Sequence, residues 1–169
     1  MKEFIYTVYL SEIIFQIKIA QQAATRLPID PGNFDHIEAW CSIQSILVAT
    51  GNVSKILWPI SKKSKERGKK LRELLCINEN NIIANRNLRN HFEHYDERIE
   101  ALFEDQSSVS FIDLAFTPFK PEKWGIPKFY QRAYNQVEGV LTFRNETLDL
   151  KKILIALENI KEKCSAYTL

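Results

Sequence analysis

The stretch that decides the predicted fold runs from Asn85 to Glu100 and reads NRNLRNHFEHYDERIE. Apolar residues in and just after it recur at the i, i+4, i+7 and i+11 spacing of a helix face that packs on a core: Leu88, Phe92, Tyr95, Ile99, Leu102 and Phe103. This spacing predicts one long helix over residues 81–104, the spine of a helical bundle. At about 100° per residue, Arg86, Asn90 and His94 follow one another at single-turn intervals on the side away from the core.

The two histidines of this helix are expected to face different directions. With Leu88 as the centre of the apolar stripe, His91 lies roughly 60° from the centre, at the edge of the stripe, and His94 lies about 120° from it. An exposed histidine can move protons near neutral pH because its unperturbed pKa is about 6.5. His94 is therefore the better-placed histidine for chemistry, and His91 is the second candidate.

The stretch contains the same short motif twice, because residues 86–91 and residues 89–94 both read Arg-Asn, three residues, His. At these residues the chain resembles the HEPN superfamily of small helical domains, whose signature is an arginine followed after four to six positions by a histidine. The resemblance implies a helical bundle, metal-independent cleavage of RNA, and a homodimer in which two copies of the motif meet. It also implies an antitoxin or a nucleotidyltransferase as a partner. Toxin-type members often carry a tyrosine two residues after the histidine, where this chain has Glu93 and Asp96.

The chemistry of RNA cleavage through the 2′-hydroxyl fits the residue types of this motif. The reaction needs a base for the 2′-hydroxyl proton, donors for the phosphorane oxygens and an acid for the leaving 5′-oxygen, and no metal is obligatory. Histidine can transfer the protons, arginine can clamp the phosphate, and an asparagine amide can orient either group. We therefore expect His94 as base or acid, Arg89 or Arg86 as phosphate clamp, and Asn90 as orienting group.

The spacing of Arg89 and His94 raises a geometric difficulty for a single chain. Five positions place them roughly 140° apart on an ideal helix. A distorted helix, Arg86 as the partner of His94, or a second subunit would each resolve it, and we favour a two-fold symmetric homodimer. A different interpretation stays open, in which the same face is an ordinary solvated surface with ion pairs such as Arg89 with Glu93. The chain would then be a non-catalytic interaction or nucleotide-binding module, or a toxin–antitoxin or defence component.

The most basic part of the chain is residues 62–72, which contain seven Lys or Arg and one acid. Such a run can follow a phosphate backbone, although a solubilising loop and helix start is its commoner role. It contains no aromatic residue for base stacking. We expect a patch that steers RNA, and the candidate RNA-binding residues are Lys62, Lys63, Lys65, Arg67, Lys69 and Lys70.

Length and composition set broad limits on the class of protein. A chain of 169 residues predicts a single domain over residues 1–169, and the formal charge of +2 means that RNA contacts must come from local patches. Cys41, Cys76 and Cys164 are widely separated and lack a C-x-x-C pair, so neither a zinc site nor a disulfide framework is expected. Without a long uncharged apolar run, we expect a cytoplasmic protein with no membrane span. Phosphate-cradling glycine motifs and metal-binding H-x-x-x-H spacings are absent from the sequence, so we expect no metal and no other cofactor.

Apolar patterns in the first third of the chain predict further helices. One covers residues 4–27. A second covers about residues 34–50, is capped by the turn at residues 30–33 and stops at Gly51. A short third helix follows, with Asn52 as its N-cap.

The segment at about residues 109–146 changes character and predicts an insertion into the helical domain. Its apolar run at residues 111–116 could form a short strand, and residues 130–134 and 140–144 predict a β-hairpin. The helical pattern then returns, with Asp149 as N-cap. The predicted fold class is therefore mainly α, a HEPN-like helical bundle of four to five helices with a small appended β-hairpin.

Overall fold

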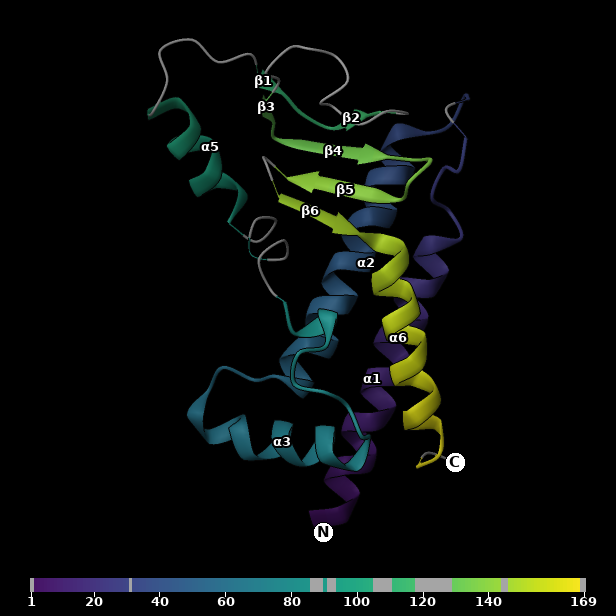
Figure 1. Cartoon of the computed structure of the whole chain (residues 1–169), viewed down its shortest axis with the longest axis vertical. Helices are drawn as coiled ribbons and strands as arrows, with labels where there is room; N and C mark the ends of the chain where they lie inside the picture. The colour runs from purple at the N-terminus through teal and green to yellow at the C-terminus, as the bar shows by residue number, and fades with distance from the viewer. Residues whose placement is uncertain are drawn as a thin grey trace. The chain divides into compact units, whose positions relative to one another are not determined.

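The computed structural model describes residues 2–30, 32–85, 90, 94–104, 111–117, 129–143 and 146–167. Figure 1 shows its α-helices, which are α1 (Lys2–Ala24), α2 (His36–Leu57), α3 (Lys65–Leu74), α5 (Tyr95–Glu104) and α6 (Leu150–Ser165). Two 3-10 turns are η1 (Lys62–Ser64) and η2 (Ile82–Ala84). The strands are β1 (Phe111–Ile112), β2 (Ala115–Phe116), β3 (Phe129–Tyr130), β4 (Arg132–Asn135), β5 (Val140–Phe143) and β6 (Glu146–Asp149).

The fold is mainly α-helical with a small sheet in the C-terminal part of the chain, which confirms the predicted class at that level. Its contacts divide it into two compact units. Unit 1 consists of Met1–Arg26, Cys41–Arg86 and Lys152–Leu169, and unit 2 of Leu27–Trp40 and Asn87–Lys151. A single domain over residues 1–169 stays a prediction. Among the described residues, no helix has both the length and the apolar character needed to cross a bilayer.

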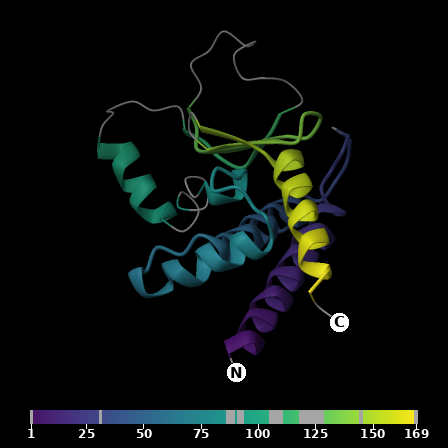
Figure 2. The same cartoon turned by 60° about the horizontal axis from the view of Figure 1, so that its bottom comes forward.

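Unit 1 is built around α1, which makes hydrogen bonds to α2, α3 and α6. α1 and α6 lie side by side in both views (Figures 1 and 2), and Gln21 of α1 donates a hydrogen bond to the carboxylate of Glu158 on α6. Aliphatic side chains with at most 2% of their surface exposed form the core between these helices: Leu10, Ile13, Ile17, Ile43, Ile46, Leu57 and Leu157. Burial of such side chains supplies about 1.5–3 kcal/mol each.

Helix α2 is longer than its sequence predicts. It was expected to stop at Gly51 and to be followed by a short helix capped by Asn52, and this prediction is wrong because α2 continues to Leu57. The Asn52 amide donates to Gln16 Oε1 at 3.1 Å, which ties α2 to α1. Val53 and Leu57 have no exposed surface, and their burial outweighs the cost of about 1 kcal/mol for a glycine inside a helix.

The N-cap of α2 also differs from the prediction. The turn at residues 30–33 was expected to supply the cap, but Asp35 does so. Its Oδ1 accepts hydrogen bonds from the backbone N–H groups of Ile37 at 2.8 Å and Glu38 at 3.0 Å. Such a cap satisfies two of the donors that the first turn of a helix leaves without partners.

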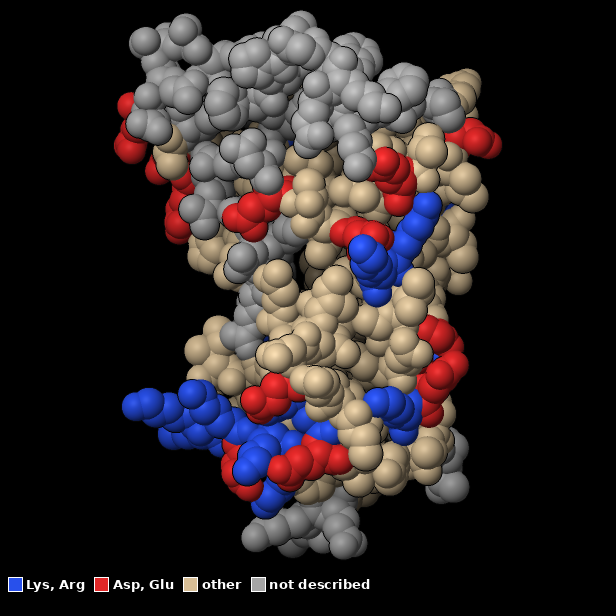
Figure 3. Space-filling model, in the orientation of Figure 1, with Lys and Arg blue, Asp and Glu red and all other residues tan. Residues whose placement is uncertain are grey.

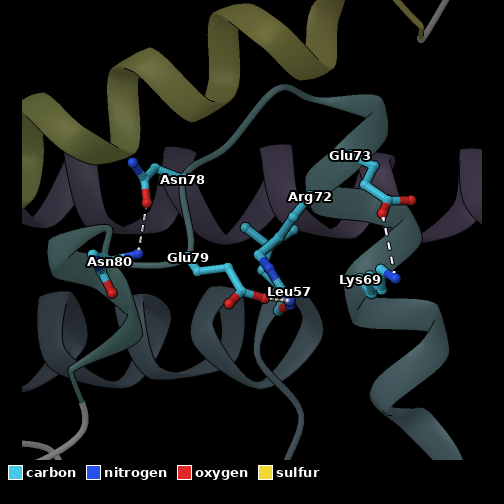
Figure 4. A network of polar contacts seen from close by, with 7 residues as sticks. All are labelled: Leu57, Lys69, Arg72, Glu73, Asn78, Glu79 and Asn80. Atoms are coloured by element: carbon cyan, nitrogen blue, oxygen red, sulfur yellow. Dashed lines mark hydrogen bonds and ion pairs between the residues drawn. The ribbon is translucent and has the colours of Figure 1, made fainter.

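The predicted single helix over residues 81–104 is also wrong. Asn81 accepts a hydrogen bond from Ile83 N and begins the 3-10 turn η2, and Asn85 then has extended backbone angles of φ −71° and ψ 127°. The helix described farther along, α5, has 10 residues. Just before η2, the Asn78 side chain accepts from Asn80 N at 2.9 Å (Figure 4). Asparagine side chains that accept hydrogen bonds from nearby backbone N–H groups in this way compete with helix formation. The spacing of apolar residues contains no information about this competition.

The sheet of unit 2 contains the predicted hairpin and extends it. β4 and β5 are antiparallel, with Arg132 opposite Phe143 and Asn135 opposite Val140. The strand order is β2-β4-β5-β6, so β6 and the parallel strand β2 join the hairpin in one four-stranded sheet. β1 and β3 form a separate parallel pair. α6 begins at Leu150, where the sequence predicts a helix start.

Candidate functional site

The predicted catalytic histidine, His94, lies one residue before α5 in unit 2. Its backbone N–H donates to the carbonyl of Asn90 at 3.0 Å, so Asn90 and His94 are one helical turn apart. The His94 side chain is 52% exposed, and its Nδ1 lies 3.2 Å from Oε1 of Glu97. The imidazole therefore faces solvent, as the helical wheel predicts, and the carboxylate of Glu97 is its partner.

This arrangement orients the imidazole for proton transfer. A carboxylate that accepts from Nδ1–H fixes the tautomer and leaves the lone pair of Nε2 available as a base. Glu97 can therefore act as a positioning residue for His94.

Of the other motif residues, the structure describes only Asn90. Arg86, Arg89 and His91 lie outside the described residues, so a pairing of either arginine with His94 stays a prediction. Asn90 is half-buried. Of the predicted site, the described residues thus bring together Asn90 and His94.

A second polar cluster in unit 2 was missed by the sequence analysis. Asp113 accepts hydrogen bonds from Arg132 Nε at 2.9 Å and from a terminal guanidinium nitrogen of Arg132 at 2.6 Å. The Tyr95 hydroxyl donates to Asp113 Oδ2 at 2.9 Å. Arg132 also lies over the Tyr95 ring, 4.2 Å from its centroid. The cluster thus connects the first residue of α5 to β4.

The charge states of this cluster follow from its surroundings. Burial by itself raises the pKa of Asp113, but the hydrogen bonds and the positive charge of Arg132 outweigh that effect and hold the pKa below its ordinary value. Burial, together with the hydrogen bond to Asp113, raises the pKa of Tyr95. At neutral pH the carboxylate is therefore ionised and the phenol protonated. The cluster fixes the beginning of α5, directly after His94, and so helps to position the candidate site.

A sequence signal for this cluster existed. Asp113 is the one charged residue in the apolar run at residues 111–116, and Arg132 is the one charged residue in residues 130–134. Charged residues in strands that pack on a core need partners, because burying an unpaired charge is costly. The sequence could therefore have predicted that each has a partner, although not that the partner of each is the other.

The basic run of unit 1 forms η1 and α3, where Lys and Arg gather on the lower left of Figure 3. Lys62, Lys63 and Lys65 are exposed and have no ion-pair partner in the described part of the chain. Lys69 and Lys70 are paired with Glu73 at 3.8 Å and with Glu66 at 3.4 Å, respectively. Exposed i, i+4 pairs of this kind contribute little to stability. The lysines most available for a phosphate backbone are therefore Lys62, Lys63 and Lys65.

Arg67 was predicted to bind RNA, but its guanidinium is engaged inside unit 1. It donates to the Tyr9 hydroxyl at 3.1 Å, lies over the Tyr9 ring, and donates to the carbonyls of Lys55 at 3.3 Å and Ile56 at 3.4 Å. Arg72 donates to the next carbonyl, that of Leu57, and to Glu79 at 2.7 Å (Figure 4). The two arginines of α3 thus satisfy the last carbonyls of α2, and RNA binding by Arg67 stays a prediction.

The third histidine, His36, lies in an aromatic cluster. Its ring stacks on Phe34 with centroids 4.8 Å apart and lies 4.8 Å from the ring of Phe116. His36 is exposed but has no carboxylate partner within the described residues. It offers a comparison for His94, because both imidazoles are accessible and only His94 is oriented by an acid.

The cysteines of the chain are free thiols. Cys41 and Cys76 are exposed, and burial raises the pKa of Cys164 to about 12. Among the described residues, no group of three or more His, Cys, Asp or Glu side chains could hold a metal ion.

No protein-family model, curated protein or solved structure matches this chain. The resemblance to the HEPN superfamily therefore rests on the residues of the Arg-Asn-x-x-x-His motif alone.

Proposed function

We propose that this chain is a metal-independent endoribonuclease of HEPN type that acts through attack of a ribose 2′-hydroxyl on the adjacent phosphodiester. The observation that carries the proposal is the exposed imidazole of His94, whose Nδ1 lies 3.2 Å from the Glu97 carboxylate. His94 ends the second copy of the motif, and Asn90 precedes it by one helical turn.

The reaction assigns a step to each group. Nε2 of His94 takes the proton of the 2′-hydroxyl as the 2′-oxygen forms a bond to phosphorus. The bond from phosphorus to the 5′-oxygen breaks, and the leaving oxygen takes a proton. The products are a 2′,3′-cyclic phosphate and a 5′-hydroxyl, and no water is consumed. Arg89 or Arg86 donates to the phosphorane oxygens, and a homodimer supplies the arginine from the second subunit where one chain cannot.

The exposed lysines of η1 and α3 supply sequence-independent affinity for the RNA backbone in this proposal. Each phosphate contact on a single strand contributes about 0.7 to the slope of log affinity against log salt concentration. Replacing Lys62, Lys63 and Lys65 by Gln should therefore make that slope shallower by about 2. The control replaces Lys69 and Lys70, whose ammonium groups already have acidic partners, and should change the slope by less than the value of about 1.4 that two free lysines would give.

Cleavage of single-stranded RNA in the presence of EDTA tests the catalytic proposal. His94→Ala should lower the rate by about 10²–10⁴-fold, the usual contribution of a general acid or base. Glu97→Gln should lower it by less than His94→Ala does, because Glu97 acts only through the orientation of His94. His36→Ala is the matched control and should cleave as the wild type does. An inactive wild type, or equal cleavage by wild type and His94→Ala, would refute the proposal.

A second candidate is a non-catalytic interaction or nucleotide-binding module, as a toxin–antitoxin or defence component. It is favoured by the exposure of both members of the His94–Glu97 pair, because i, i+3 pairs are also common on solvated helix faces. The EDTA experiment separates the two candidates, since this module would cleave no RNA.

A further inference from the structure

The turn between β1 and β2 contains a residue in an unusual backbone conformation. Leu114 has a φ of 53°, in the left-handed region that a residue with a Cβ adopts only at a cost in free energy. Such residues persist where the surrounding structure holds them, and they are frequent at functional sites. Leu114 is 39% exposed, so the packing of its side chain does not explain the conformation. The explanation lies in its backbone contacts.

Both backbone groups of Leu114 are engaged within unit 2. The N–H donates a hydrogen bond to the carboxylate of Asp113, and the carbonyl accepts one from Nε1 of Trp40 at 3.3 Å. The Trp40 ring is buried and also contacts Arg132, whose guanidinium carbon lies 5.9 Å from the ring centroid. The left-handed turn thus joins a buried tryptophan to the pair of Asp113 and Arg132.

The same carboxylate binds the first turn of α5. The Tyr95 hydroxyl donates to Asp113 Oδ2 at 2.9 Å, so the Tyr95 side of α5 faces Asp113. At about 100° per residue, the side chain of His94 points about 100° away from that side and the side chain of Glu97 about 160° away. The bound tyrosine therefore sets the rotation of α5 about its axis, and with it the direction in which the pair of His94 and Glu97 faces.

We propose that the Tyr95 hydroxyl is the point at which the sheet of unit 2 positions His94. Asp113 binds that hydroxyl, and Leu114 and Trp40 keep Asp113 in place. All of them are positioning residues, because they act on His94 only through the first turn of α5. Their contribution to RNA cleavage rests on the proposed function, whereas the orientation of the imidazole does not and can be measured without RNA.

The pair of His94 and Glu97 needs such support because both side chains are exposed. Their side chains are 52% and 66% exposed, and an exposed ion pair contributes little by itself. The two residues are neighbours only while residues 94–97 stay helical, and the first turn of a helix is held by few internal hydrogen bonds. The hydrogen bond of Tyr95 lies inside this span and is partly buried, so it keeps the turn helical.

The tautomer of His94 measures this orientation directly. When Nδ1–H donates to Glu97, the proton stays on Nδ1 and Nε2 keeps its lone pair. In ¹⁵N NMR spectra at pH 8.5, the wild type should carry the His94 proton mainly on Nδ1, and Tyr95→Phe should show a mixture of the two tautomers. Phenylalanine keeps the ring that Arg132 contacts and removes only the hydroxyl. The wild-type tautomer in Tyr95→Phe would overturn the proposal.

A matched control separates positioning from a general loss of stability. Tyr134→Phe removes the hydroxyl of a buried tyrosine on β4 that makes no hydrogen bond within the described residues. This variant should leave the His94 tautomer unchanged, and the imidazole of His36 provides a reference in every spectrum. Equal changes of the His94 tautomer in Tyr134→Phe and Tyr95→Phe would contradict a specific role of the Tyr95 hydroxyl.

Two substitutions of Leu114 test the left-handed backbone. Glycine adopts this conformation without a steric cost, so Leu114→Gly should keep the wild-type tautomer of His94. A β-branched residue disfavours a positive φ, so Leu114→Val should shift the tautomer as Tyr95→Phe does. Both variants shorten the same exposed side chain, so a difference between them comes from the backbone. The same tautomer in both variants would overturn the role of Leu114.

RNA cleavage tests the contribution to the rate. Tyr95→Phe should lower kcat by about 2–10-fold with KM unchanged, the rate equivalent of one hydrogen bond. In a Glu97→Ala background the same substitution should have little further effect, because the pair through which it acts is already lost. Effects that multiply would overturn the positioning role. A wild type that cleaves no RNA would refute the ribonuclease, and the tautomer would still decide this proposal. An unchanged tautomer with active wild type would overturn this proposal alone.

Discussion

Removing the carboxylate of Asp113 should destabilise unit 2 more than any loss of an exposed charge. Asp113 makes three hydrogen bonds, two with Arg132 and one with Tyr95. The side chains of Asp113 and Arg132 are 14% and 19% exposed, so Asp113→Ala removes one member of a largely buried ion pair together with its three hydrogen bonds. Breaking a buried pair by removing one partner costs about 3–5 kcal/mol, and the remaining solvent access lowers our expectation to about 2–4 kcal/mol.

Urea unfolding followed by circular dichroism measures this effect. Asp113→Ala should lower the free energy of unfolding in urea by about 2–4 kcal/mol. In a thermal scan the melting temperature should fall by about 4–16 °C. Asp113→Asn should have a smaller effect, because the amide still accepts from the Tyr95 hydroxyl. Asp96→Asn, on the exposed side of α5, is the control and should change stability by less than about 0.5 kcal/mol. An Asp113→Ala variant as stable as this control would refute the structural role of the cluster.

The pH dependence of Asp113→Asn provides a second readout. The pKa of Asp113 lies below its ordinary value of 3.8 in the folded protein. The folded state therefore gains stability from the ionised carboxylate above about pH 4, and this gain is lost as the pH falls through the lowered pKa. The difference in stability between wild type and Asp113→Asn should shrink on acidification. A difference that grows between pH 5 and pH 3 would contradict the lowered pKa.

Three further predictions concern unit 1. Gly68→Ala should destabilise the protein by about 1–3 kcal/mol in thermal unfolding, because a Cβ there would lie 2.8 Å from the Leu57 carbonyl oxygen. This cost should outweigh the helix preference of alanine. Gly32→Ala, whose Cβ meets nothing within 4 Å, is the control. Arg72→Met should cost about 1.5–3 kcal/mol in urea unfolding because it leaves a carbonyl of α2 without its charged donor, and an unchanged midpoint would contradict the capping role. Iodoacetamide at pH 8 should label the two exposed cysteines and spare Cys164, because burial raises the pKa of Cys164 to about 12. If mass spectrometry found all three cysteines of the native protein labelled, the burial of Cys164 would be contradicted.

How far the sequence predicts the fold depends on whether a pattern is local. The helix over residues 4–27 and the hairpin of β4 and β5 were predicted because apolar spacing and turn residues determine them within a few positions. The continuation of α2 past Gly51 was not predicted, because it depends on the burial of Val53 and Leu57 against residues far away in the chain. The break at Asn85 was missed for the opposite reason, since local asparagine hydrogen bonds outweighed a regular apolar pattern.

For the candidate site, too, the sequence predicts local contacts but not contacts between distant residues. The outward direction of His94 follows from the helical wheel, and its nearness to Asn90 follows from the length of one turn. The contact with Glu97 could also have been predicted, because residues three positions apart on a helix are neighbours. The pairing of Asp113 with Arg132 could not, since it joins residues 19 positions apart on different elements. A basic run also does not reveal that the guanidinium of Arg67 donates hydrogen bonds inside unit 1.

The ends of the RNA fragments test the central claim most directly. An oligonucleotide with a single ribose in a deoxyribose background is incubated with the protein in EDTA, and its products are identified by mass spectrometry. Attack by the 2′-hydroxyl with His94 as proton carrier predicts cleavage only at that ribose, with a 2′,3′-cyclic phosphate on one fragment, a 5′-hydroxyl on the other, and loss of both in His94→Ala. No cleavage, cleavage at deoxyribose positions, or fragments that end in a 5′-phosphate would contradict it.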